Sequence, residues 1–189
     1  MPRPKHRETI VRTAARLFRR QGYAATGVNQ IVEVARAPKG SLYHHFPGGK
    51  DEIAEAAVRF SGAKVAATLR DLAERHGSTR DMIRAYGRLL AGWVEASGFS
   101  DGCAITTTLL ETAPTSEPIT KAGREAFDGW RAILTASLIR DGLTGPEAER
   151  KAALVIAALE GGLILARVEQ STRPIEEVFA ALSDLLHQP

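Results

Sequence analysis

The sequence predicts an all-α protein of about nine helices, and three observations support this fold class. Apolar residues recur three or four positions apart along almost the whole chain, whereas the strict alternation of a half-buried strand is nearly absent. The chain has 189 residues, 44% of them hydrophobic and 25% charged, a composition that can form a substantial core. Glycine and proline stand mainly between the periodic segments, where they end one helix and precede the next.

The first three predicted helices are short and closely spaced. Apolar residues at helical spacing predict a helix over about residues 5–21, which ends at Gly22. Thr26 can cap a second helix that ends near Arg36. Pro38 suits the first turn of a third helix, because an N–H group is not needed there. We therefore expect a compact three-helix unit.

Longer helices make up the rest of the chain. Thr144 and Glu147 have the spacing of a capping box and predict the start of one of them. Hydrophobic periodicity predicts six such helices, over about residues 50–76, 79–97, 103–112, 118–140, 145–169 and 174–187. We expect two domains, residues 1–48 and residues 49–189, which meet at a hinge around Pro47, Gly48 and Gly49.

Charge divides the chain in the same place. Residues 1–50 hold ten Lys and Arg against two acids, a net charge of +8, whereas the remaining residues hold 15 against 20, a net charge of −5. A basic first quarter on an acidic remainder indicates a head that binds a polyanion and a body with another task. A solvated basic surface is the simpler alternative.

The third helix has the residues of a DNA-recognition helix. With its apolar positions turned inward, small and polar side chains face outward at its N-terminal end, as entry into a major groove requires. Lys50 lies at the start of the fourth helix, where backbone N–H groups attract phosphate. The candidate DNA contacts are Thr26, Lys39, Gly40, Ser41, Tyr43, His44 and Lys50.

Three segments within the first 53 residues resemble a known family. These are Thr26-Gly-Val-Asn-Gln-Ile-Val and Pro38-Lys-Gly-Ser-Leu-Tyr-His-His-Phe46, followed by Gly49-Lys-Asp-Glu-Ile53. They resemble the DNA-binding segment of the TetR family of bacterial regulators, in its LmrA/YxaF-like branch. Further likeness, to the C-terminal domain of that branch, lies at Gly102-Cys103, at Leu159-Glu-Gly-Gly-Leu-Ile-Leu-Ala-Arg167 and at Ser171-Thr-Arg-Pro174. The chain departs from the pattern at Pro38 and Ala104.

The resemblance implies a homodimeric repressor that binds a palindromic operator in double-stranded DNA and leaves it when a small hydrophobic effector binds. It also implies that Thr26, Lys39, Tyr43, His44 and Lys50 contact phosphates, while residues 37–41 approach the bases. In this scheme the effector tilts the helix over residues 50–76 and changes the distance between the two recognition helices.

The last two predicted helices, over about residues 145–169 and 174–187, are the expected dimer interface. The first is rich in alanine and glycine, which allow helices to approach closely, and the second has a leucine-rich face. The alternative is that both helices are ordinary core helices of the monomer.

Aromatic residues with a few polar neighbours indicate an effector pocket in the body. Glu160 stands on an apolar helix, where an unpaired carboxylate would be costly to bury. The simpler alternative is that the aromatic residues fill the core, that Cys103 is a small core residue and that Glu111 lies on an exposed turn. The candidate pocket residues are Trp93, Phe99, Cys103, Thr107, Glu111, Phe127, Trp130, Glu160 and Leu163.

Other classes of protein fit the sequence less well. The five histidines are scattered, and no phosphate-binding glycine loop or serine elbow is present, so we expect no enzyme, metal site or cofactor. If the protein were a nonspecific architectural DNA binder, the acidic body would have no function.

The sequence also predicts where the protein is found. No apolar run is long enough to span a bilayer, no signal peptide is recognisable, and a lone cysteine suits a reducing compartment, so we expect a cytoplasmic protein.

Overall fold

The computed structural model describes residues 3–186, without the side chains of residues 3–5 and of Lys39, and this part of the chain holds nine α-helices and no strand. The all-α fold is therefore confirmed. The helices are α1 (Arg3–Gln21), α2 (Val28–Val34), α3 (Lys39–His45), α4 (Gly49–Arg75), α5 (Thr79–Ala96), α6 (Ala104–Thr112), α7 (Glu117–Arg140), α8 (Gly145–Glu169) and α9 (Arg173–Leu185). None of these helices has the length and apolar character that crossing a bilayer requires.

Tertiary contacts divide the chain into two units, each built from two stretches of sequence. The first unit holds the chain up to Ala63 together with Cys103–Ala126, and the second holds Lys64–Gly102 together with the chain from Phe127 onward. Helices α4 and α7 each contribute to both units. The domain boundary that the sequence predicts after residue 48 lies inside the first unit.

In the first unit, α1 packs against α2, α3 and α6. The core of α1, α2 and α3 consists of side chains with no exposed surface, among them Ile10, Phe18, Ile31, Leu42 and Phe46. Burying five large apolar side chains stabilises this small unit by about 1.5–3 kcal/mol each. The spacing of these residues is the one from which the sequence predicts the three helices.

Two glycines let the helices α4, α6 and α7 approach closely within the first unit. A Cβ on Gly62 of α4 would lie 2.6 Å from the Cβ of Ala126 of α7. A Cβ on Gly123 of α7 would lie 2.5 Å from Leu109 of α6. A side chain at Gly62 would meet the fixed Cβ of Ala126, whereas one at Gly123 would have to displace the Leu109 side chain. Both glycines therefore serve packing rather than turns.

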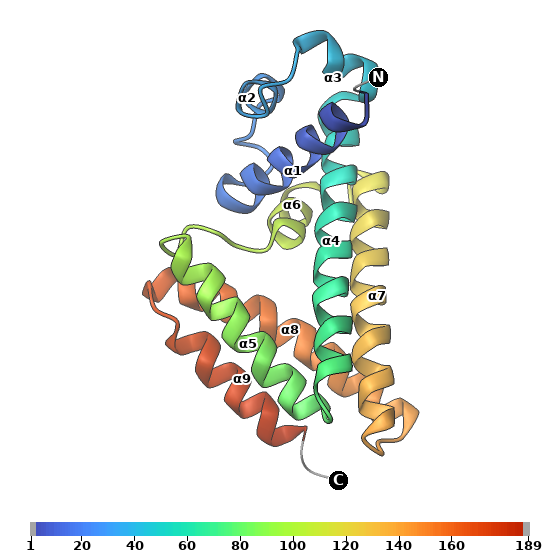
Figure 1. Cartoon of the computed structure of the whole chain (residues 1–189), viewed down its shortest axis with the longest axis vertical. Helices are drawn as coiled ribbons and strands as arrows, with labels where there is room; N and C mark the ends of the chain where they lie inside the picture. The colour runs from blue at the N-terminus through green and yellow to red at the C-terminus, as the bar shows by residue number, and fades with distance from the viewer. Residues whose placement is uncertain (1–2, 187–189) are drawn as a thin grey trace. The chain divides into compact units, whose positions relative to one another are not determined.

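In the second unit, α5, α8 and α9 lie side by side (Figure 1). The apolar face of α9 is used within the monomer, because Ile175, Phe179 and Leu182 are buried. A Cβ on Gly162 of α8 would lie 3.9 Å from Ile175 of α9. The leucine-rich face of α9 therefore packs inside the unit, and only Leu185, at 39% exposure, remains as a large apolar side chain on its surface.

Two predicted helix caps are wrong in detail. Gly27, not Thr26, is the N-cap of α2, because the Thr26 hydroxyl donates instead to the Gly22 carbonyl at 2.7 Å. Thr144 is the N-cap of α8, but its side chain makes no capping hydrogen bond. A cap of the expected kind occurs at α5, where Ser78 accepts from the Asp81 N–H at 3.1 Å.

Candidate nucleic-acid interface

Helices α2 and α3 form a helix-turn-helix whose second helix presents its polar side outward. Leu42 and the capping residue Phe46 are fully buried, which fixes the orientation of α3. The Tyr43 side chain is 68% exposed, and a large aromatic side chain with this exposure is available to a partner. Gly40 is exposed with open space around its Cα, so a DNA backbone or base edge can approach it.

The other predicted residues of α3 also lie on or near this surface. His44 is exposed and Ser41 is half-buried. His45, which stacks edge-on against His44 with ring centroids 5.1 Å apart, is half-buried. The side chain of Lys39 lies outside the described residues, although its backbone opens α3.

The turn between α2 and α3 contains a residue in a left-handed conformation. Arg36 has φ of 51°, and the N–H of Ala37 donates to the Val32 carbonyl across it at 3.1 Å. This geometry ends α2 in the way that a glycine usually does. Arg36 is exposed, so the turn places a cationic side chain three residues before α3.

Lys50, at the start of α4, is held beside the turn between α1 and α2. Its Nζ lies 4.1 Å from the centre of the Tyr23 ring and 3.4 Å from the Ala24 carbonyl oxygen. The Tyr23 hydroxyl donates to Asp51. Burial lowers the pKa of Lys50, and the nearby carboxylates of Glu111 and Asp51 oppose this shift. Burial first, and then the bond to Asp51, raise the pKa of Tyr23.

Thr26 supports this turn and does not present its side chain to solvent. The side chain has no exposed surface, and its hydroxyl is bonded to Gly22 as described above. In this structure the Thr26 side chain therefore belongs to the frame of the turn, and its contact with a phosphate stays a prediction.

Glu111, expected to line an effector pocket, instead contacts the head. Its Oε1 accepts from the Tyr23 N–H at 3.1 Å, and its Oε2 accepts from the Ala24 N–H at 2.6 Å. One turn earlier on α6, the Thr107 hydroxyl lies 3.0 Å from the Phe18 carbonyl oxygen. These two polar side chains of α6 are thus engaged with the end of α1 and the turn that follows it.

The remaining predicted pocket residues differ in burial. Trp130 and Leu163 are buried, and Trp130 packs edge-on against Phe127 at 5.3 Å between ring centroids. Trp93 is 48% exposed and packs edge-on against Tyr86. The others, Phe99, Cys103 and Glu160, are half-buried. Trp93, Phe99, Phe127, Trp130, Glu160 and Leu163 all belong to the second unit, whereas Cys103 belongs to the first.

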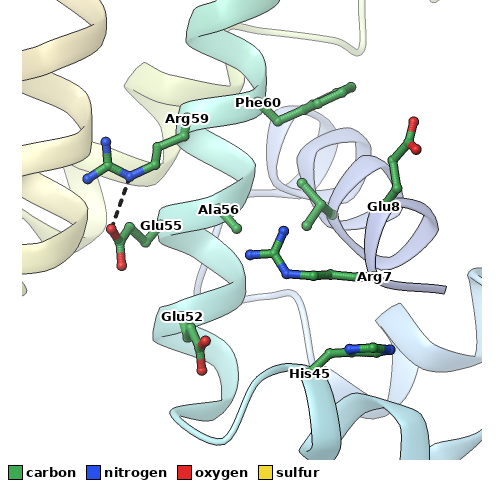
Figure 2. Close-up of a pocket in the computed structure, with 9 residues that line it drawn as sticks. Arg7, Glu8, His45, Glu52, Glu55, Ala56, Arg59 and Phe60 are labelled. Carbon is green, nitrogen blue, oxygen red and sulfur yellow. Dashed lines mark hydrogen bonds and ion pairs between the residues drawn. The ribbon is translucent and has the colours of Figure 1, made fainter. Parts of the chain in front are cut away.

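A hollow of about 600 Å³ lies between α1 and α4 in the first unit. Figure 2 shows Arg7 reaching from α1 toward Ala56 of α4, with Phe60 above it and the Glu55–Arg59 ion pair beyond. Arg7 also lies over the Phe46 ring at 5.3 Å. None of the predicted pocket residues lines this hollow. Its lining contains side chains of both charges and consists of Arg7, Glu8, Val11, His45, Glu52, Glu55, Ala56, Arg59 and Phe60.

A three-helix head with an outward recognition helix and a separate helical unit define the class of the protein: it has the architecture of a helix-turn-helix DNA-binding regulator. Residues 10–57 match the family described as "Bacterial regulatory proteins, tetR family", and residues 79–181 match "Transcriptional regulator LmrA/YxaF-like, C-terminal domain". The chain belongs to the TetR family of transcriptional regulators, in its LmrA/YxaF-like branch. The members of this family are regulators and not enzymes.

Individual relatives agree with this assignment. The chain is 33% identical over 180 residues to the HTH-type transcriptional regulator LmrA of Bacillus subtilis, covering 95% of this chain and 96% of that protein. It is 30% identical to a TetR transcriptional regulator from Chloroflexus aurantiacus, with a TM-score of 0.82 and coverage of 98% and 96%. A cysteine mutant of the TetR-family regulator CifR, in complex with a 26-bp operator DNA, has the same fold at 19% identity, with a TM-score of 0.76 and 96% coverage of both chains.

Two features of this interface are not predicted from the sequence. Tyr23 was not among the predicted residues, although an aromatic residue directly after a helix-ending glycine is a signal that could have drawn attention to it. The contact of Glu111 with the head left no signal in the sequence, because it joins groups 88 positions apart.

Proposed function

We propose that this protein is a repressor that binds a palindromic operator as a homodimer and leaves the DNA when a small hydrophobic effector binds. The single observation that carries the proposal is the outward face of α3, with Tyr43 68% exposed beside an open Gly40, on a head of net charge +8. Such a face supplies cations and hydrogen-bond donors to phosphate while its slender N-terminal end enters the major groove.

In this proposal Lys39, Tyr43, His44 and Lys50 contact phosphates, and Gly40 and Ser41 approach base edges. Two half-sites about 34–36 Å apart require two heads in one assembly. The operator complex of the related regulator CifR supports this mode of binding. Binding to chromosomal DNA places the protein in the cytoplasm.

The proposed dimer forms through α8 and α9. Large apolar side chains on α8 remain exposed in the single chain, at 45% for Leu154, 54% for Ile164 and 76% for Val168. They repeat at helical spacing along one face, as an interface helix requires. The buried face of α9 holds α8 in place, and its exposed Leu185 adds to the interface.

The proposed effector site uses the aromatic side chains of the second unit. Trp93, Phe99, Phe127 and Trp130 supply apolar surface, and Glu160 supplies a half-buried carboxylate. Such a lining suits a hydrophobic molecule with one polar or cationic group. Effector and operator must then weaken each other's binding by the same factor.

Selection of duplexes from a random-sequence library by the full-length protein tests the proposal. We expect a palindrome to emerge and to bind at least about a thousandfold more tightly than a scrambled duplex at the same salt concentration. Replacing Lys39 and Tyr43 together by alanine should weaken binding and reduce the dependence of affinity on salt, whereas Lys121→Ala, outside the head helices, should change neither.

A different result would identify a different function. If no palindrome emerges and all duplexes bind alike, the protein is a nonspecific DNA binder and not an operator-binding repressor.

A further inference from the structure

Glu111 closes the turn between α1 and α2 from outside the helix-turn-helix. Each of its carboxylate oxygens accepts one backbone N–H, from Tyr23 at 3.1 Å and from Ala24 at 2.6 Å. Bonds from N–H groups to an ionised carboxylate are stronger than those to a neutral acceptor. A single side chain of α6 therefore fixes two consecutive residues of this turn.

The turn is shaped to receive this carboxylate. Gly22 has φ of 84°, and a Cβ at that position would collide with Glu111 Oε1. The Thr26 hydroxyl closes the far side of the turn on the Gly22 carbonyl. The Thr107 hydroxyl, on the same helix as Glu111, lies between two acceptors, the Cys103 carbonyl at 2.8 Å and the Phe18 carbonyl at 3.0 Å. The backbone conformation at Gly22, the missing Cβ there and the two N–H donors of the turn therefore all favour the position of the Glu111 carboxylate.

The two residues that Glu111 holds are also the ones that hold Lys50. The Lys50 ammonium packs on the Tyr23 ring and reaches the Ala24 carbonyl oxygen. The Tyr23 hydroxyl is bonded to Asp51, the next residue of α4. The position of the Lys50 charge at the start of α4 therefore depends on the turn, and the turn depends on α6.

We propose that Glu111 is a positioning residue for operator binding: its carboxylate fixes the turn of Tyr23 and Ala24 so that Lys50 is held ready for a phosphate. This inference rests on the proposed operator contact of Lys50. It assigns to an acidic residue outside the helix-turn-helix a favourable effect on DNA affinity.

Electrostatics alone predicts the opposite effect. An exposed carboxylate near a phosphate-binding surface repels DNA, so its removal should strengthen binding. A positioning role predicts that removal weakens binding, because the lysine loses its fixed place. The sign of the change therefore separates the two roles of Glu111.

The experiment measures the affinity of full-length Glu111→Gln and Glu111→Ala variants for the selected palindrome at one salt concentration. Glutamine keeps one acceptor oxygen and loses the charge, so we expect a loss of a few fold. Alanine removes both contacts, and we expect a loss of about tenfold. The control is Glu33→Gln on α2, an exposed acid in the same head, which should bind equally well or slightly more tightly.

A second arm tests whether Glu111 acts through Lys50. In a Lys50→Met background the loss caused by Glu111→Ala should shrink to less than about threefold, because the group to be positioned is absent. Equal losses in both backgrounds, or tighter binding by both Glu111 variants, would overturn the proposal.

Amide hydrogen exchange keeps the inference testable even if a variant folds poorly. In the wild-type protein the Tyr23 and Ala24 amides should exchange slowly, and exchange at the unprotected rate would refute the contact. Failure of the proposed function is a different result, because the wild-type protein itself would then show no preference for any palindrome.

Discussion

Three residues other than glycine adopt left-handed conformations in the described chain, and each follows the end of a helix. They are Arg36, Phe99 and Gln170, with φ of 51°, 57° and 49°. A side chain with a Cβ is strained there, whereas glycine is not. Arg36 lies in the head and Gln170 in the second unit, so the two allow the same substitution to be compared in different surroundings.

Replacing Arg36 by glycine is expected to stabilise the fold by about 1 kcal/mol, because the strain at positive φ is relieved. Gln170→Gly should act in the same direction for the same reason. Urea denaturation of the full-length variants measures both changes. Arg16→Gly, in the exposed middle of α1, is the matched control and should destabilise by about 1 kcal/mol. A loss of stability at both left-handed positions would contradict the strain argument.

At the scale of helices, the packing of α5 against α9 depends on a glycine. A Cβ on Gly87 would lie 2.7 Å from Cγ of Phe179, and Phe179 is buried. The same helix carries Gly92, around which a Cβ would meet nothing within 4 Å. One helix therefore contains a glycine required by packing and a glycine that packing does not require.

Gly87→Ala is expected to destabilise the protein by about 1–3 kcal/mol through overpacking against Phe179. Gly92→Ala should instead stabilise it by up to about 1 kcal/mol, because alanine favours a helix and finds open space. Thermal unfolding followed by circular dichroism compares the two. Equal and positive shifts in Tm would show that the Phe179 ring moves aside without cost.

At the scale of the whole molecule, α8 has more exposed large apolar side chains than any other helix of the described residues, namely Leu154, Ile164, Leu165 and Val168. Its buried face contains Val155, Leu159 and Leu163, while Ile164 and Val168 point away from these contacts. A helix that is apolar on two sides is expected to have a second partner. The second copy of the chain in the proposed dimer is that partner.

Val168→Glu combined with Ile164→Glu should convert the proposed dimer into a monomer, since two carboxylates would be buried in an apolar interface. Sedimentation velocity measures the change, and operator affinity should fall with it because one head binds one half-site. Ile139→Glu, at a 49% exposed position on α7, is the control and should leave the assembly unchanged. A dimer that persists in the double variant would place the interface elsewhere.

The local parts of this structure could be predicted from the sequence because their determinants are close together along the chain. Apolar spacing and the glycines and prolines between segments identify all nine helices of the described chain, with ends that differ by a few residues. The orientation of α3 follows from Leu42 and Phe46, which lie one helical turn apart and are both buried. Because Leu42 and Phe46 face the core, the neighbouring Tyr43 side chain must face solvent.

Hydrogen bonds between distant segments could not be predicted in this way. The sequence includes Glu111 among the candidate pocket residues, but its hydrogen-bond partners, the N–H groups of Tyr23 and Ala24, depend on where α6 packs against α1. The leucine-rich face of α9 is apolar in any arrangement, and only the fold directs it toward α5 and α8 within the chain.

The sequence by itself determined the all-helical class, the basic head and the recognition helix, since helix periodicity and charge are properties of neighbouring residues. The tertiary structure decided that α6 closes the turn beside Lys50 and that the second unit combines two separate stretches of chain. The physical reason is that a carboxylate acquires its role from the donors it meets, and those donors are brought to it only when distant helices pack.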